Sequence, residues 1–176
     1  FDVGPGMSLL NLLTQRLTNG EQAFDVGGRL AVQGRRISKL VDHWLSHEYF
    51  QNPPPRWEPR GVSPQSFLDD SLRMALQQGW SVRDLLCSAT HFAADTVALA
   101  FERIPAGQAG SDGILLTGGG QANGMLLREI ASRLPQANLT ALQQRGINNH
   151  TLDAASAAVL AALHLDQVPA NLPAVT

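Results

Sequence analysis

The segment 113–134 constrains the fold more than any other part of the sequence, because two hydrophobic periods meet there across a glycine triplet. An apolar run at 114–116 precedes the triplet, and Asn123 opens a helical pattern that stops at Pro135. Strand, glycine turn and amphipathic helix in this order are typical of a phosphate- or nucleotide-binding corner, where bare backbone N–H groups and a helix start attract anions. A tight turn without a ligand fits equally well, since a glycine triplet alone is a weak signal. The triplet consists of Gly118, Gly119 and Gly120.

Composition limits the compartment and the partners. The 176 residues are 44% hydrophobic and 16% charged with a net charge of −2, which is ordinary for one globular domain and lacks the basic excess of a nucleic-acid-binding protein. Cys87 is the single cysteine, and its helical surroundings favour a buried, inert thiol. We therefore expect a cytoplasmic protein with no membrane span. The chain starts without methionine in a strand-like motif, and we expect a fragment of a longer protein.

Helical periodicity dominates the chain, and strand character is confined to 1–3, 114–117 and 139–142. A small sheet is therefore expected. The segment 37–50 is predicted as one helix, and the longest helix is predicted to run to Ile104. An Ala-rich last helix is thin enough to pack closely against a sheet or another helix. The residues predicted to begin or cap helices are Ser8, Ser63, Ser81 (with Asp84 completing a capping box), Asn123 and Thr151.

Four charged residues each have two interpretations. Asp2 ends a strand-like stretch, where carboxylates of open α/β sheets face the ligand crevice, but a turn-capping role fits too. Asp153, in the first turn of the last helix, faces a ligand or complements the helix dipole. Arg56 and Arg60, on a loop stiffened by three prolines, clamp phosphate or are solvated.

Histidines give no metal prediction. His43 and His47 are four residues apart on a predicted helix, but the sequence offers no third ligand nearby, so we expect surface histidines and no metal site. We expect His91, within the longest helix, to be structural.

Collinear motifs extend over nearly the whole chain. They are Phe1-Asp2-Val3-Gly4-Pro5-Gly6, the stretch 25–34, Pro53-Pro54-Pro55, Gly118-Gly119-Gly120-Gln121-Ala122-Asn123, Gly146-Ile147, Asp153 and Asn171-Leu172-Pro173-Ala174-Val175-Thr176. In this order they resemble the C-terminal half of the anhydro-N-acetylmuramic acid kinase family, within the actin/hexokinase/Hsp70-like superfamily. The resemblance implies an α/β fold: an actin-like ATPase (ribonuclease H-like) lobe, helix-rich with a small mixed sheet. Residues 1–176 would form the C-terminal lobe of a two-lobe kinase, without its N-terminal lobe.

The resemblance also implies a function, which is ATP-dependent phosphorylation and hydrolytic ring opening of 1,6-anhydro-N-acetylmuramic acid to N-acetylmuramic acid 6-phosphate in peptidoglycan recycling. ATP and Mg²⁺ are the implied cofactors. The implied roles are catalytic base for Asp2, phosphate binding for Gly4 and Gly6, adenosine binding for Gly118, Gly119, Gly120 and Asn123, nucleotide-phosphate contacts for Arg56 and Arg60, and sugar binding for Asp153.

Departures from the family pattern keep alternatives open. Met7 and Asn11 replace the family's Asn and Asp, and bulky Trp57 with acidic Glu58 replaces small residues of a loop near the nucleotide phosphates. The chain is then a divergent kinase, a related amino-sugar kinase, or a non-catalytic or regulatory relative that binds sugar or nucleotide. Expected partners are the amino sugar and the N-terminal lobe, with a homodimer left open and with no nucleic acid or membrane. The isolated fragment is predicted to be inactive, because half of the phosphate cradle lies in the other lobe.

Overall fold

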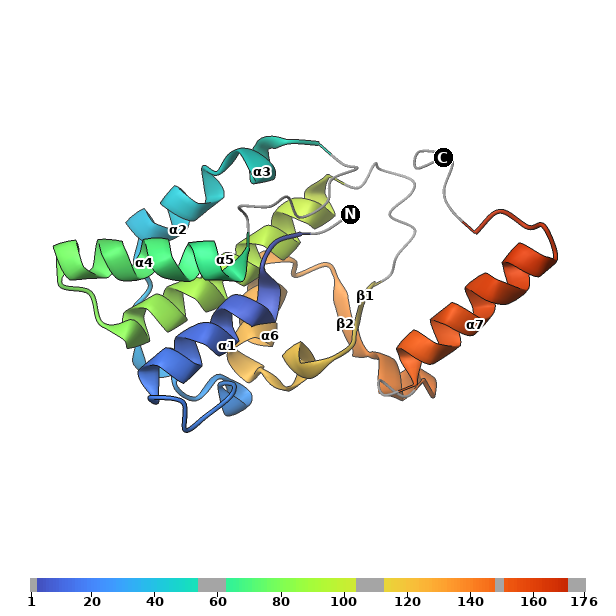
Figure 1. Ribbon diagram of the computed structural model, residues 1–176, viewed down its shortest axis with the longest axis horizontal. Coiled ribbons are helices and arrows are strands. Elements are labelled where there is room, and N and C mark those ends of the chain that lie inside the picture. Colours follow the sequence, from blue (N-terminus) through green and yellow to red (C-terminus); the bar gives the residue numbers. More distant parts are fainter. Residues whose placement is uncertain (1–2, 54–62, 104–112, 148–150, 171–176) are drawn as a thin grey trace.

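The computed structural model describes residues 3–53, 63–103, 113–147 and 151–170, and it has a helix-rich α/β fold (Figure 1). The helices are α1 (Gly6–Leu17), α2 (Ser38–Leu45), α3 (Glu48–Gln51), α4 (Pro64–Gln78), α5 (Val82–Glu102), α6 (Gly124–Arg133) and α7 (Leu152–Leu165). Short 3-10 turns are η1 (Val26–Gly28), η2 (Ala31–Gln33), η3 (Gly119–Ala122) and η4 (Leu142–Arg145). Strands β1 (Gly113–Leu116) and β2 (Asn138–Ala141) complete the described elements.

Strands β1 and β2 are hydrogen-bonded neighbours in a parallel pair, and α6 lies between them along the chain. Gly113 is aligned with Asn138, and Leu116 with Ala141. Parallel strands need a crossover connection, and α6 provides it, so β1, α6 and β2 form one βαβ unit. The predicted small sheet is confirmed, with each strand displaced by one residue from its predicted range.

Local sequence signals determine several helix ends. The Ser63 side chain accepts a hydrogen bond from the Ser66 N–H at 3.2 Å, and Pro64 occupies the first helical position of α4. Ser81 and Asp84 form the predicted capping box at the start of α5. Both predictions are confirmed. The sequence could predict these caps because capping depends on residues within one turn of each other.

Helix α5 is the centre of the packing. It contacts α1, α2, α4, α6 and η2, and Figure 1 shows it running through the middle of the helical part of the molecule. Its Phe92 is 1% exposed and lies between the rings of Trp44, Phe50 and Phe67, with centroid distances of 5.2, 5.4 and 5.5 Å. A helix buried around most of its circumference, as predicted, places β1 and α6 on a rigid base. None of the described helices is both long and apolar enough to cross a membrane.

Three predicted boundaries differ from the structure. Pro5, not Ser8, is the N-cap of the first helix, and Ser8 lies within its first turn. The segment 37–50 is two helices, because His47 adopts an extended backbone and caps α3 through its ring nitrogen. The predicted strand 1–3 begins outside the described residues, and Val3 is not in a strand. The predicted end of the longest helix at Ile104 also lies outside the described residues, and α5 is described to Glu102.

Helix α7 stands apart from the helical core in Figure 1. In the part of the chain that the structure describes, none of its residues is buried, and Val159 and Leu160 are more than half exposed. The predicted close packing of this Ala-rich helix is therefore absent among the described residues.

Candidate functional site: two facing glycine turns

The glycine triplet forms the corner between β1 and α6, as the sequence predicts. Gly118 has φ 72° and ψ −168°, a conformation that is strained for any residue with a Cβ. A Cβ built at Gly118 or Gly119 would meet no described atom within 4 Å, so the backbone here borders open space. The predicted strand, glycine turn and helix are confirmed, and the corner is accessible to a ligand.

Asn123 holds this corner together from inside. Its side chain is 2% exposed, and Oδ1 accepts a hydrogen bond from the N–H of Leu126 at 3.0 Å, which caps α6. Its own N–H donates to the carbonyl of Gly120 at 3.0 Å. Nδ2 is buried and finds no partner among the described residues. A buried amide N–H without a partner is uncommon and indicates a position that a ligand or water would satisfy.

A second glycine turn lies at the start of α1. Gly4 has φ 145° and Gly6 has φ 48°, so both adopt backbone conformations that favour glycine. A Cβ at Gly4 would lie 3.2 Å from Cε1 of Phe50 and 3.5 Å from Cγ2 of Thr96. Close packing on the aromatic core therefore fixes this turn in place.

The structure brings the two turns together. A Cβ built at Gly120 would lie 3.4 Å from Cγ and 3.5 Å from Sδ of Met7, the residue that follows the turn at Gly4 and Gly6. Within the described helices, neither α1 nor α6 has an acidic residue in its first turn. An uncompensated helix start attracts anions, so neither helix start opposes an anionic ligand.

Of the remaining predicted site residues, the structure describes only Asp153. Asp2, Arg56 and Arg60 lie outside the described residues. Asp153 is exposed in the first turn of α7, and no hydrogen bond or ion pair among the described residues links it to either glycine turn. The nucleotide, base and sugar contacts of all these residues therefore stay predictions.

The histidines have structural partners. His43 Nε2 lies 2.7 Å from Oδ2 of Asp70 on α4, and His47 Nδ1 accepts from the N–H of Tyr49 at 3.2 Å. Among the residues that the structure describes, no group of three His, Cys, Asp or Glu side chains is placed to hold a metal ion. Cys87 is buried as predicted, and burial raises the pKa of its thiol, with further contributions from the Asp84 and Glu129 charges.

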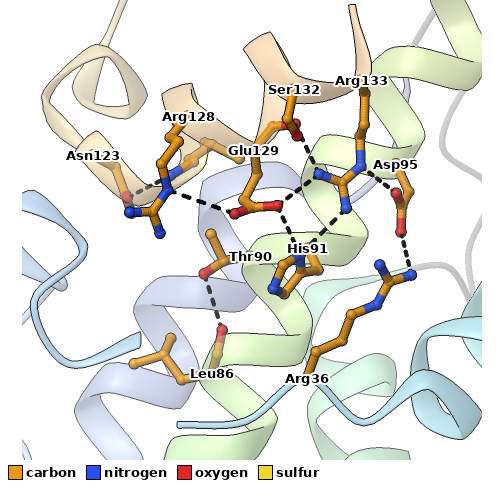
Figure 2. A network of polar contacts seen from close by, with 11 residues as sticks. Arg36, Leu86, Thr90, His91, Asp95, Asn123, Arg128, Glu129, Ser132 and Arg133 are labelled. Atoms are coloured by element: carbon orange, nitrogen blue, oxygen red, sulfur yellow. Dashed lines mark hydrogen bonds and ion pairs between the residues drawn. The ribbon is translucent and has the colours of Figure 1, made fainter. Parts of the chain in front are cut away.

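A polar network between α5 and α6 escaped the sequence prediction (Figure 2). Arg133 is paired with Asp95 through Nε, and its Nη1 lies 2.9 Å from Oε2 of Glu129. Nδ1 of His91 lies 3.1 Å from Oε2 of Glu129 and 3.3 Å from Nη2 of Arg133. The protonation of Nδ1 therefore decides with which of the two it pairs. Arg36 reaches Asp95 from the other side at 3.3 Å.

Burial and ion pairing have opposite effects in this network. Burial raises the pKa of Glu129. Its hydrogen bond to Arg133 and the His91 and Arg128 charges together lower this pKa by more than burial raises it, so the net pKa is below the ordinary value. Burial is the largest reason why the pKa of His91 is lowered. The spacing of four residues between Glu129 and Arg133, and between His91 and Asp95, was the sequence signal available for this network.

The structure defines a helix-rich α/β protein with a small parallel sheet, which agrees with the predicted actin-like fold. The family profile described as anhydro-N-acetylmuramic acid kinase matches residues 1–176. The chain therefore belongs to the anhydro-N-acetylmuramic acid kinase family, and the resemblance predicted from the motifs is confirmed.

Curated relatives agree with this assignment. The protein named anhydro-N-acetylmuramic acid kinase from Acaryochloris marina (strain MBIC 11017) is 32% identical over 176 residues, and its namesake from Cyanothece sp. (strain PCC 7425 / ATCC 29141) is 35% identical over 177 residues. Each alignment covers 100% of this chain and 46% of the relative. The chain thus spans about half the length of the curated relatives it matches.

Proposed function

We propose that residues 1–176 form the C-terminal lobe of an ATP-dependent anhydro-N-acetylmuramic acid kinase. The observation that carries the proposal is that Met7, which follows the turn at residues 4–6, lies close to Gly120 of the glycine triplet, in a chain that belongs to this family. The proposed reaction opens 1,6-anhydro-N-acetylmuramic acid with water and yields N-acetylmuramic acid 6-phosphate, as a cytoplasmic step of peptidoglycan recycling.

The residues of the two turns fit a nucleotide. The exposed backbone at Gly118 and Gly119 borders open space, and neither α1 nor α6 has an acidic residue in its first turn that would repel phosphate. We propose that Gly4 and Gly6 bind phosphate, that residues 118–120 with Asn123 bind adenosine, and that Arg56 and Arg60 contact the nucleotide phosphates. ATP would supply the phosphoryl group, with Mg²⁺ neutralising phosphate charge.

Asp2 and Asp153 are the proposed residues on the sugar side. A carboxylate at position 2, directly before the phosphate turn, can accept a proton from water as the anhydro bridge opens. The sugar hydroxyl freed at C6 then accepts the phosphoryl group. Asp153 would hydrogen-bond the sugar. Because phosphoryl transfer depends mainly on positioning and charge stabilisation, both lobes are needed, and this chain alone should show no turnover.

The apolar surface of α7 supports the two-lobe proposal. Val159, Leu160 and Leu165 are 57%, 53% and 80% exposed, although a helix apolar on all sides is normally covered. Leu115 on β1 is also exposed. We propose that the other half of the longer protein covers these residues, since the relatives are about twice the length of this chain.

The test is Asp2→Asn in the full-length protein that carries this chain, measured by coupled ADP release with the anhydro sugar. Loss of a general base typically lowers kcat by about 10²–10⁴, whereas the KM values should change little because Asn has nearly the same shape. If Asp2 only caps the turn, kcat should stay near wild type, because Asn caps almost as well as Asp. Wild-type turnover in Asp2→Asn would remove the proposed base.

One observation favours a second candidate function. Met7 places an apolar thioether at the contact between the turns, where the family pattern has an amide. A relative that binds nucleotide or sugar without turnover would tolerate this change. Nucleotide binding by the full-length wild-type protein without ADP release in the presence of the sugar would favour this candidate over the kinase.

A further inference from the structure

The loop around η1 is packed onto the inner side of the nucleotide corner. Its conformation is fixed by Asp25, which is 4% exposed and accepts hydrogen bonds from the N–H groups of Leu30 and Ala31, both at 2.9 Å. Because both carboxylate oxygens are used by backbone donors, the loop is held in a single shape. The family resemblance included this stretch without giving it a role.

Gly28 is the point where the loop meets the corner. It is buried with φ 78°, and a Cβ added to it would lie 2.5 Å from Oδ1 of Asn123 and 2.8 Å from Cβ of Met125. Real Cβ atoms do not approach other atoms so closely. Any side chain at this position must therefore displace either the loop or the first turn of α6.

Asn123 carries such a displacement to the glycine triplet. Oδ1 of Asn123, the atom nearest to Gly28, is the atom that accepts from the Leu126 N–H and caps α6. The backbone N–H of the same residue donates to the carbonyl of Gly120. One residue therefore couples the loop to the helix start through its side chain and to the glycine turn through its backbone.

We propose that Gly28 and Asp25 are positioning residues for the nucleotide, acting through Asn123 on residues 118–120. The inference rests on the proposed function, because it assumes that the corner binds ATP. Neither residue needs to touch the nucleotide. The close approach of Gly28 keeps Asn123 in the rotamer that caps α6 and leaves the backbone of the turn facing the ligand.

The chain contains a matched control for Gly28. Gly27 has a similar positive φ of 70°, but a Cβ added there would meet the nearest atoms, Cγ and Nε of the Arg29 side chain, at 3.9 Å. Alanine at either position introduces the same strain of a positive φ. Only Gly28→Ala also pushes on Asn123, so the difference between the two variants isolates that contact.

The experiment compares Gly28→Ala with Gly27→Ala in the full-length protein, using ADP release and ADP titration calorimetry. Relative to Gly27→Ala, we expect Gly28→Ala to raise the KM for ATP and the Kd for ADP by about tenfold, which corresponds to 1.4 kcal/mol of lost binding. The KM for the sugar should be the same in both variants. A general loss of stability would not separate the two substrates in this way.

Equal KM values for ATP in the two variants, with normal wild-type turnover, would overturn the inference and leave the proposed function standing. Wild-type protein that binds no ADP would overturn the proposed function, and the inference with it. If Gly28→Ala does not fold, Asp25→Asn decides the question, because it replaces one carboxylate oxygen that accepts from a backbone N–H with an amide donor and adds no bulk. A raised KM for ATP in Asp25→Asn supports the inference, and an unchanged KM overturns it.

Discussion

Arg133 connects α6 to α5, and replacing it with methionine tests how much this connection stabilises the corner. Methionine keeps an apolar stem of similar length, so the change removes mainly the guanidinium. Asp95 and Glu129, both with side chains 17% exposed, would then lose their common cation. Among the described residues, Asp95 would keep only Arg36, and Glu129 would keep only His91 and the exposed Arg128. Each carboxylate would therefore lose its closest cationic partner, which is unfavourable between packed helices.

The magnitude follows from burial. Removing one partner of a fully buried ion pair costs about 3–5 kcal/mol. The Arg133 side chain is 16% exposed, so solvent screens part of the loss, and we expect Arg133→Met to lower the free energy of unfolding by about 2–3 kcal/mol. Arg128 on the same helix is the control, because its side chain is 68% exposed and lies 3.8 Å from Glu129. Arg128→Met should cost less than about 1 kcal/mol.

Urea unfolding of the full-length protein at pH 7 measures both variants, with tryptophan fluorescence as the probe of the buried Trp44. The midpoint should fall clearly for Arg133→Met and hardly at all for Arg128→Met, with little change in the m value. Equal midpoints for the two variants would refute the reasoning, because they would show that the network is no stronger than a surface ion pair.

Two further predictions concern pH and helix capping. The pKa of His91 is lowered in the folded protein, so the unfolded state takes up the proton first, and stability should fall as pH decreases below about 6.5, the ordinary value. The lowered pKa of Glu129 adds a second loss as pH falls below about 4.5. Unfolding midpoints measured between pH 7 and 5 should therefore be flatter for His91→Gln than for wild type, and parallel profiles would contradict this. Ser81→Ala should lower the free energy of unfolding by about 1 kcal/mol, and by more than Ser63→Ala does, because only Ser81 is paired with a reciprocal carboxylate, that of Asp84. Equal melting temperatures in the two variants would exclude the capping-box contribution.

The amino-acid sequence by itself determined the local elements of this protein. The caps at Ser63, Ser81 and Asn123 and the strand before the glycine triplet were all predictable. Each depends on residues within a few positions of each other, so the pattern contains the physical cause. Collinear motifs predicted the family in the same way.

Only the tertiary structure decided which of these elements meet. Met7 lies close to Gly120 and Gly28 close to Asn123, which brings together segments about 100 residues apart, and the second approach requires that residue 28 has no Cβ. A glycine adds nothing to a hydrophobic pattern, so the sequence does not indicate which side chain packs against it. The Arg133 network was hidden for a related reason, since its helix spacing also fits a solvated face and only the packing of α6 on α5 buries it.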